Sequence, residues 1–506
     1  MRRLKLRTAI AAGATAALIA TGAVATSAPA VAESHSIVQA DKPTPTTSTD
    51  FQNLNGFMWF YNTYFDYKYK DITRNLDQLK SNGVRVLGFF SPYNGNKNMC
   101  DGCSPLDFYS VSPQNGTIQD WRDLVAAAHR KGMKVVAYFV NIYMDASSPF
   151  FLKAQQQYAA GDRTSREVAA FDWTTDPTAP LPTLRSGPPT ESMWTWSPIA
   201  KAYYWQLWYG PGFDFDNPGS VAEVQRIEKF WLDTGLDGFM WDAGKADPRL
   251  ENLDVTLPKT YTKSDKWLTF EQAGTVAGRG ATDAPTSAAF GLTSWFNYQD
   301  QGDWTNDYTR LVNGSIDVDG LEAELKNSDY ARSVGATTHA WSISGDDPQA
   351  NFDTHTYPTY ANDDVMRVQE AALLAGSGVL YGSAMYDQYL TWSPTLRANW
   401  NRVLETVNGN KALLPAASRT RVPAGPDPKV YSEQRTSEDG KQTALLVYNF
   451  NPTPTTVTVD LTGTGIDLKQ QPKDLYNGGK GAKIDGSNYS VQLPGYGFTF
   501  LDVKAK

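Results

Sequence analysis

Short apolar runs alternate along most of the chain with longer stretches in which apolar residues recur every three or four positions. The strand-like runs cover residues 56–64, 84–90, 133–140 and 236–241, and the helical stretches cover residues 71–82, 120–131 and 221–233. Gly83 and Gly235 mark the change from helix to strand. Strands that alternate with helices across short glycine turns predict a parallel α/β architecture. The number of units favours a closed (β/α)8 barrel over an open sheet.

Two stretches depart from this alternation. Residues 147–198 are rich in Pro, Thr, Ser and Trp, and we expect an inserted loop region at the C-terminal face of the barrel, where barrel active sites are built. From residue 422 onward the apolar residues follow a β pattern, in runs at 444–450, 455–461 and 489–503. We therefore predict an α/β fold, a TIM barrel over 51–417 followed by a C-terminal antiparallel β-sandwich domain over 422–506.

The amino terminus has the three-part layout of a secretory signal peptide. A basic head with Arg2, Arg3 and Lys5 precedes an apolar run over 8–25, and a small-x-small site ends at Ala32. An uncleaved membrane anchor is the alternative, but no stop-transfer pattern follows. Residues 33–50 are mostly Ser, Thr, Pro and Asp, which is typical of a disordered linker. We expect a signal peptide over 1–32 and a mature protein that is secreted, extracellular and free of membrane.

The net charge argues against one class of partner, and the two cysteines indicate a local link in the chain. The 506 residues carry a formal net charge of -8, which argues against a nucleic-acid partner because phosphate binding needs a basic face. The two cysteines, Cys100 and Cys103, are separated by two residues. Such a pair can be a redox centre or half of a zinc site, but no further zinc ligands are evident nearby. In an exported chain we favour a local disulfide between them.

Three acidic residues follow strand-like runs. Asp242 and Glu271 end two such runs directly, and Asp346, with Asp347 beside it, follows a third. The C-terminal ends of barrel strands carry catalytic groups, and glycoside cleavage with retention needs two carboxyl groups about 5–5.5 Å apart. Singly, each acid has an ordinary alternative, since an Asp after a strand is often a helix N-cap.

The chain is also rich in aromatic residues, with 15 Trp and 26 Tyr. Trp194, Trp196, Trp205 and Trp208 belong to or follow the inserted region. They are interpreted either as stacking platforms for sugar rings or as core and loop anchors.

Several segments, in collinear order, resemble the α-amylase family of glycoside hydrolases over nearly all of the mature length. They are residues 80–92, 106–111, 115–121, 126–135, 214–218, 230–243, 367–381 and 444–450. The resemblance implies that Asp242 is the nucleophile, Glu271 the general acid/base, and Asp346 a third acid that binds ring hydroxyls. Tyr143, Trp241, Asp107 and Asp347 are the expected substrate-binding residues.

The chain departs from the family pattern at several positions. Met240 stands where the family usually has an Arg, Tyr143 and Gly345 stand where it usually has His, and Cys103 lies near its sugar-stacking aromatic. The segment 235–244 is also similar to the nucleophile strand of the α-glucosidase and α-galactosidase clan. Under that alternative, Asp346 or Asp347 is the acid/base and Glu271 has no role. A carbohydrate-binding protein without catalysis is a further alternative.

The expected function is that of a secreted, retaining α-glycoside hydrolase or transglycosylase acting on an α-linked oligo- or polysaccharide. Some relatives in the family bind calcium, and Asp145 and Asp216 are conceivable ligands. No dense acidic loop with calcium-ligand spacing is present, however. We therefore expect no cofactor and assign no metal site, with calcium left as an open alternative, and the sequence does not indicate an oligomeric state.

Overall fold

The computed structural model describes residues 55–99, 102–182, 192–241, 266–270, 295–297, 307–333, 338–341, 363–376 and 380–506. The predicted signal peptide and linker lie outside these ranges. All described residues belong to one compact unit. Within them, no helix combines the length and the apolar character that crossing a membrane requires.

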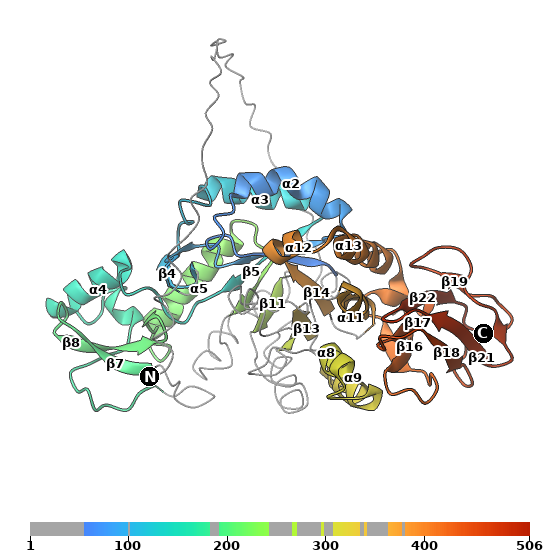
Figure 1. Cartoon of the computed structure of the whole chain (residues 1–506). Coiled ribbons are helices and arrows are strands. Elements are labelled where there is room, and N and C mark those ends of the chain that lie inside the picture. The colour runs from blue at the N-terminus through green and yellow to red at the C-terminus, as the bar shows by residue number, and fades with distance from the viewer. Residues whose placement is uncertain are drawn as a thin grey trace, which may run out of the picture. The chain divides into compact units, whose positions relative to one another are not determined.

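Eight parallel strands of the described chain form one sheet (Figure 1). They are β1 (Phe57–Phe60), β2 (Val86–Phe90), β5 (Lys134–Phe139), β10 (Gly238–Trp241), β11 (Trp267–Phe270), β12 (Trp295–Asn297), β13 (Thr338–Trp341) and β14 (Leu380–Met385). Consecutive strands pair from β1 to β11 and from β12 to β14, and β14 pairs with β1. This order confirms the predicted barrel. Strands β1, β2 and β10 are buried along their whole length, as expected of parallel strands that are covered on both faces.

Side chains alternate between the barrel interior and the surrounding helices. The interior is filled by large rings: Trp59 lies 6.3 Å from Trp267 between ring centroids and covers Gly88, where a Cβ would come within 2.2 Å of the indole. On the outer face, Phe89 packs against Trp121 of a helix, with ring centroids 5.1 Å apart. The two-residue period of a strand thus separates a packed interior from a packed helix layer.

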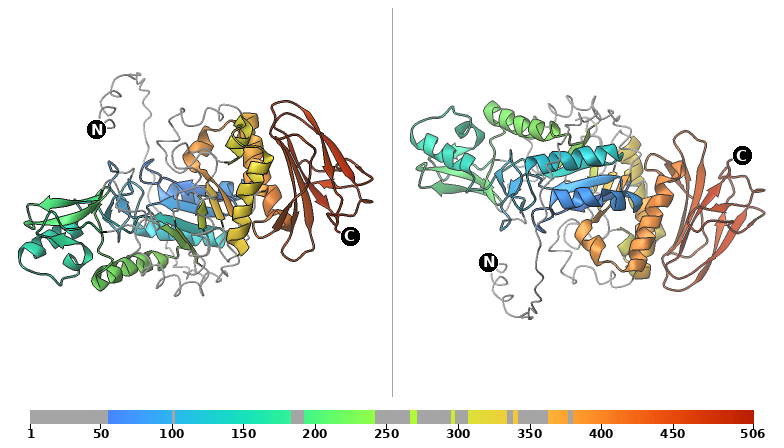
Figure 2. Two further views of the ribbon diagram at one scale, coloured as in Figure 1. Left: turned by 90° about the horizontal axis from the view of Figure 1, so that it is seen from below. Right: turned by 90° about the horizontal axis from the view of Figure 1, so that it is seen from above.

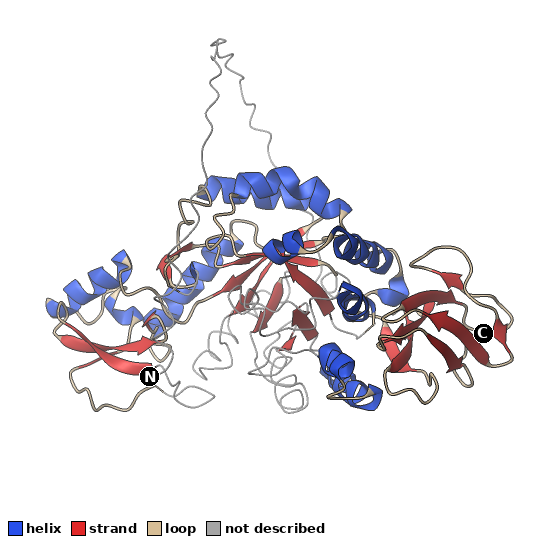
Figure 3. Ribbon diagram, viewed as in Figure 1, coloured by secondary structure: helices blue, strands red, loops and turns tan. Residues whose placement is uncertain are grey.

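Helices flank the barrel strands (Figure 3). They are α2 (Tyr69–Ser81), α3 (Ile118–Arg130), α5 (Pro218–Leu232), α8 (Asp307–Asn313), α9 (Val318–Ser333), α11 (Asp363–Ala375), α12 (Tyr386–Thr391) and α13 (Pro394–Asn408). Figure 2 shows α2, in blue, and α3, in cyan, side by side. Thr117 and Asp120 form a capping box at the start of α3, and Asn217 caps α5 ahead of a proline at the first helical position.

The segment between β5 and α5 is a folded insertion. It contains α4 (Pro149–Ala159), a 3-10 turn (Val168–Ala170), β6 (Trp173–Thr174), β7 (Ser192–Ser197), β8 (Ala202–Leu207) and β9 (Gly210–Pro211). The strands form a small antiparallel sheet around a hairpin of β7 and β8. Phe151 contacts the rings of Phe171, Trp173 and Tyr204. These aromatic contacts give the insertion more regular structure than its Pro-, Ser- and Thr-rich composition indicated.

The C-terminal domain consists of two antiparallel sheets, as predicted. One contains β15 (Ser418–Arg421), β16 (Val430–Thr436), β17 (Thr443–Asn449), β22 (Phe498–Val503) and β19 (Lys473–Asp474), and the other contains β18 (Thr455–Asp460), β21 (Asn488–Leu493) and β20 (Ile484–Asp485). The predicted strand-like run 489–503 is two strands, because residues 494–497, Pro-Gly-Tyr-Gly, form a turn between β21 and β22.

Strand β17 is buried on both faces. Leu445 and Val447 pack into the core between the two sheets, whereas Ala444, Leu446 and Tyr448 belong to the core that includes the barrel. Polar contacts reinforce this junction: Arg419 binds Glu322 of α9, with an N–O distance of 2.7 Å. The C-terminal domain is therefore packed directly against the barrel helices.

Candidate active site

The predicted nucleophile and general acid/base follow two paired strands. Trp241, the last residue of β10, is the register partner of Phe270, the last residue of β11, and also of Phe139 at the end of β5. Asp242 and Glu271 come next in the sequence, but they lie outside the described residues, as do Asp346 and Asp347. The structure therefore describes the strands that lead to the four acids and not the acids themselves.

The side chain of Trp241 faces the helix layer. Its indole Nε1 donates a hydrogen bond of 2.6 Å to Oε1 of Glu228 on α5, and Nδ2 of Asn141 donates one of 2.9 Å to the same oxygen. Only 1% of the Trp241 surface is exposed. Its contacts are thus with a buried helix acid, and a role in substrate binding stays a prediction.

Glu228 is a functional candidate that the sequence argument missed. It is fully buried, and burial raises its pKa to about 8. It stands on the buried side of α5 together with Val224, Ile227 and Trp231. A Glu inside that three-to-four spacing was the only available signal, and it is a weak one, because a single acid on a helix is more often exposed.

Tyr143 is also buried. Its hydroxyl lies 3.3 Å from Sγ of Cys103, which is disulfide-bonded, and its ring lies 6.2 Å from the rings of both Trp208 and Tyr209. The other cysteine, Cys100, lies outside the described residues. In this arrangement Tyr143 joins the loop after β2 to the start of the insertion, and its predicted contact with substrate is not tested.

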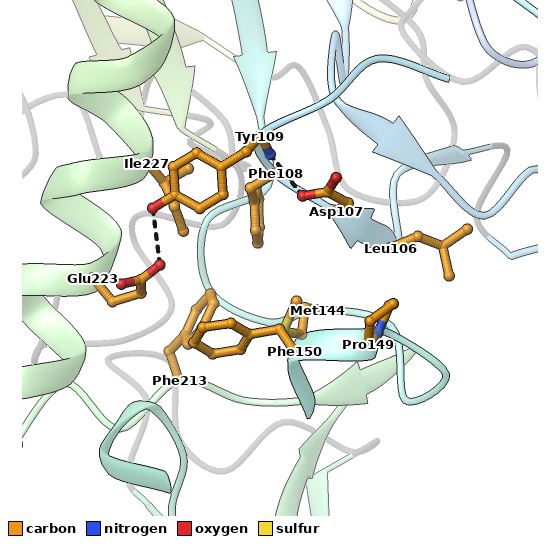
Figure 4. A pocket seen from close by; sticks show the side chains of 10 residues that line it. All are labelled: Leu106, Asp107, Phe108, Tyr109, Met144, Pro149, Phe150, Phe213, Glu223 and Ile227. Atoms are coloured by element: carbon orange, nitrogen blue, oxygen red, sulfur yellow. Dashed lines mark hydrogen bonds between the residues drawn. The ribbon is translucent and has the colours of Figure 1, made fainter. Parts of the chain in front are cut away.

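Asp107 lines a pocket of about 270 Å3 between the loop after β2, the insertion and α5 (Figure 4). The wall is mainly apolar; its residues are Leu106, Phe108, Tyr109, Met144, Pro149, Phe150, Phe213, Glu223 and Ile227. Asp107 accepts hydrogen bonds from the Tyr109 backbone N–H, at 2.9 Å, and from the Ser110 hydroxyl. Its carboxylate therefore mainly braces its own loop.

The negative charge of Glu223, at the other side of this pocket, is balanced by two arginines. Glu223 is buried and binds Arg166, Arg226 and the hydroxyl of Tyr109. Burial by itself would raise the pKa of Glu223, but the hydrogen bonds from Arg166, Arg226 and Tyr109 outweigh it and lower the pKa. This arrangement ties the insertion to α5.

The four tryptophans named above as possible sugar-stacking platforms have different surroundings. Trp205 is buried and donates to Ser192 Oγ, and Trp194 donates to the carbonyl of Ala179. Trp196 is 49% exposed and meets Tyr203 edge to face. The anchoring interpretation therefore describes Trp194 and Trp205, whereas Trp196 lies at the surface.

The conceivable calcium ligands do not gather into a site. Asp145 accepts hydrogen bonds from Asn96, Ser104 and Ser147, so donors within the protein occupy both of its oxygens, and Asp216 is an exposed residue ahead of α5. Within the described ranges, no three His, Cys, Asp or Glu residues are grouped so that they could hold a metal ion.

Comparison with known sequences identifies the barrel. Residues 56–284 match the family described as alpha amylase, catalytic domain. The trehalose synthase of Thermus thermophilus is 29% identical over 196 residues, which cover 37% of this chain and 20% of that protein. The oligo-1,6-glucosidase of Parageobacillus thermoglucosidasius is 27% identical over 196 residues, which cover 38% of this chain and 34% of that protein. The match thus spans no more than 34% of either relative.

Solved structures extend the likeness of the fold to nearly the whole chain. Amy13B of Eubacterium rectale has a TM-score of 0.65 at 14% identity and covers 92% of this chain and 98% of its own. The α-amylase of Geobacillus thermoleovorans has a TM-score of 0.66 at 14% identity and covers 90% of this chain and 99% of its own. By sequence, residues 56–284 are similar to the catalytic domain of the α-amylase family, and the chain shares the fold of these solved structures over at least 90% of its length.

Proposed function

We propose that the protein is a retaining enzyme that cleaves or transfers α-glycosidic bonds of an oligo- or polysaccharide, with Asp242 as nucleophile and Glu271 as general acid/base. The observation that carries this proposal is the pairing of β10 with β11. Gly238 pairs with Trp267, and the register continues without a shift to Trp241 and Phe270.

Side chains along β10 and β11 alternate between the barrel interior and the helix layer, and the reaction needs both carboxyl groups on the interior side. Trp267 contacts Trp59 inside the barrel, whereas Trp241 contacts Glu228 on the helix layer. Carried onward from these residues, a two-residue period predicts that Asp242 and Glu271 both face the interior, on neighbouring strands. Paired strands lie about 4.8 Å apart, which is compatible with the separation of about 5–5.5 Å between the two carboxyl groups of retaining glycosidases.

The barrel interior offers a suitable setting for two carboxyl groups with different tasks. Phe57, Trp59 and Trp267 form an aromatic cluster there, and Met240 is fully buried. Apolar surroundings raise the pKa of a carboxyl group, so Glu271 would keep the proton that it gives to the leaving oxygen while Asp242 attacks the anomeric carbon. Glu271 would then remove a proton from water or from a second sugar, which completes hydrolysis or transfer with retention.

Three finer statements belong to this proposal. Trehalose synthase and oligo-1,6-glucosidase among the relatives support an α-linked glucoside as the substrate class. The leader over 1–32 supports export to the extracellular space. The alternative clan assignment, with Asp346 or Asp347 as acid/base, leaves Asp242 as nucleophile and differs only in the identity of the acid.

Product analysis tests the activity and the nucleophile together. Purified protein and its Asp242→Asn variant are incubated with starch, pullulan, dextran, trehalose, arabinan and α-galactosides, and products are separated by chromatography. The wild type should release products from at least one substrate, and Asp242→Asn should lose at least about 10⁴-fold in kcat because the covalent route is closed. Full activity in Asp242→Asn refutes the assignment, and sugar binding without products favours a non-catalytic binding protein.

Azide rescue separates the two possible acids. With an aryl glycoside of the preferred sugar, loss of the acid/base slows mainly the second step, and azide restores it because azide needs no base. Glu271→Gln should lose about 10²–10⁴-fold in turnover and recover with azide, whereas Asp346→Asn should not recover. Rescue of Asp346→Asn or of Asp347→Asn alone would instead establish the other clan's assignment. The exposed Asp216→Asn variant is the control.

A further inference from the structure

The carboxyl group of Glu228 connects the ends of two neighbouring barrel strands. Asn141 lies two residues after the end of β5, and Trp241 is the last residue of β10. Both donate to Oε1 of Glu228, at 2.9 Å and 2.6 Å. Because β5 and β10 are paired, with Phe139 opposite Trp241, a single helix residue holds both strands at their C-terminal ends.

The surroundings of Glu228 leave it little freedom. It is 0% exposed on α5, between Val224, Ile227 and Trp231, which are also buried. Among the described residues, its second oxygen, Oε2, has no hydrogen-bond partner, and neither has Oδ1 of Asn141. A buried, unpaired carboxylate oxygen is costly, and the pKa of about 8 caused by burial agrees with a protonated, neutral acid. Glu228 therefore acts through the acceptor Oε1 rather than through charge.

Trp241 immediately precedes Asp242 in the sequence. A side chain that is fixed at its polar tip also fixes the backbone from which the next residue departs, and displacements of about 1 Å at a reacting group can cost about 10²-fold in rate. Arg is usual in the family two residues before the nucleophile, and here that position is the buried Met240, which offers no comparable anchor. The hydrogen bond from Trp241 to α5 is an anchor on the opposite face of the same strand.

From this geometry we infer that Glu228 is a positioning residue for the nucleophile: by accepting from Trp241 and Asn141 it sets the end of β10 relative to β5 and so aims Asp242. The inference rests on the proposed function, in which Asp242 is the nucleophile. It assigns no contact between Glu228 and substrate.

The decisive comparison is between Glu228→Gln, which keeps an acceptor oxygen, and Glu228→Met, which has similar length and none. Glu228→Gln should retain kcat within about threefold of the wild type. Glu228→Met should lose at least about tenfold in kcat with KM changed less than threefold, because orientation rather than binding is impaired. The matched control is Gln155→Met on α4, which likewise removes a buried acceptor, here of the Ser197 hydroxyl, and should leave kcat unchanged.

Two further measurements distinguish positioning from general loss of structure. Trp241→Phe removes one donor and should also lower kcat. The double variant should lose no more than Glu228→Met alone, since Glu228→Met already breaks the bond to Trp241. In a ¹H–¹⁵N spectrum, the indole resonance that disappears in Trp241→Phe should shift in Glu228→Met and stay in place in Gln155→Met. This readout requires no activity.

The outcomes separate the two proposals. A wild type that turns over no substrate in the panel overturns the proposed function, whatever the indole spectrum shows. An active wild type whose Glu228→Met variant is folded and keeps its kcat overturns the positioning role alone. Additive losses in the double variant have the same meaning, because they show that Glu228 and Trp241 act separately.

Discussion

Glu228 and Glu433 are two fully buried carboxyl groups in one chain. Burial raises the pKa of each from 4.5 to about 8. Glu433 lies on β16 with Arg419 at 3.8 Å, but neither of its oxygens has a hydrogen-bond partner in the part of the chain that the structure describes. Both groups are therefore expected to carry a proton in the folded protein at neutral pH and to lose it on unfolding.

This difference makes the free energy of unfolding depend on pH. Between pH 4.5 and about 8 the unfolded chain binds fewer protons at these two sites than the folded chain, so their contribution falls as the pH rises. Each group contributes a slope of at most about 1.4 kcal/mol per pH unit. Urea unfolding at several pH values should show a shallower decline in Glu228→Gln and in Glu433→Gln, and the shallowest in the double variant. An unchanged slope would mean that both groups are ionised when folded.

Among single residues, the sequence indicated some candidates for the active site and gave no clear signal for others. Asp242 and Glu271 are candidates because an apolar run ends directly before each, which is typical of the end of a buried parallel strand, and their catalytic roles stay predictions. Glu228 and the acceptor role of its carboxyl group were not found, because its partners, Asn141 and Trp241, belong to two other elements that only the folded chain brings to α5. Spacing along one helix does not contain that information.

Strand β11 leaves no room for a side chain at Gly238 of β10. A Cβ at this position would lie 1.8 Å from the carbonyl oxygen of Trp267 and 2.6 Å from its carbonyl carbon. These are backbone atoms of a paired strand, so they cannot move aside without breaking the ladder that leads towards the two predicted catalytic acids. Gly238 is thus required by the packing of β10 against β11.

Gly238→Ala should therefore lower the free energy of unfolding by at least about 1–3 kcal/mol, the usual cost of overpacking. Chemical denaturation measures this directly. Gly219→Ala, in the first turn of α5, is the control, since its methyl group would meet only the Ala169 and Asn217 side chains, both at 3.1 Å. Equal stability of the two variants would show that the strands can separate without cost.

The elements themselves were more predictable than their contacts. The helices expected at 71–82, 120–131 and 221–233 begin and end within three residues of α2, α3 and α5, because each carries an apolar stripe, and α3 and α5 also begin at a capping side chain. The insertion was less predictable, since its order comes from ring contacts such as Phe151 with Tyr204, between residues far apart in the sequence. Contacts of this kind produce no periodic pattern of apolar residues in the sequence.

For the whole molecule, the junction between barrel and C-terminal domain combines apolar surface with buried charge. The side chain of Arg419 is 1% exposed and binds Glu322 and Asp329, both on α9, and it also donates to Tyr431. Removing one partner of a buried ion pair leaves the other without compensation, which typically costs about 3–5 kcal/mol. The junction is therefore sensitive to single substitutions.

Arg419→Met should accordingly destabilise the protein by about 3–5 kcal/mol and make the C-terminal domain separable from the barrel in limited proteolysis or calorimetry. Arg421→Met is the matched control, because Arg421 binds Asp319 at the protein surface and exposed pairs contribute about 0–1 kcal/mol. If both variants unfold alike, the buried cluster does not hold the junction together.

The pairing of β1 with β14 has a consequence for how the molecule is made. Phe57 lies opposite Ser383, and Asn55 donates to the carbonyl of Leu374, so the first strand obtains its second neighbour only from the far end of the barrel sequence. The ribosome synthesises the chain from its amino terminus. One edge of β1 therefore stays unpaired until more than 300 further residues have been made. Open strand edges attract other chains, and pairing across such a separation is slow. Closure of the barrel is thus a late event for every nascent chain. Before closure, the unpaired edge of β1 is the surface that a chaperone would have to cover to prevent aggregation.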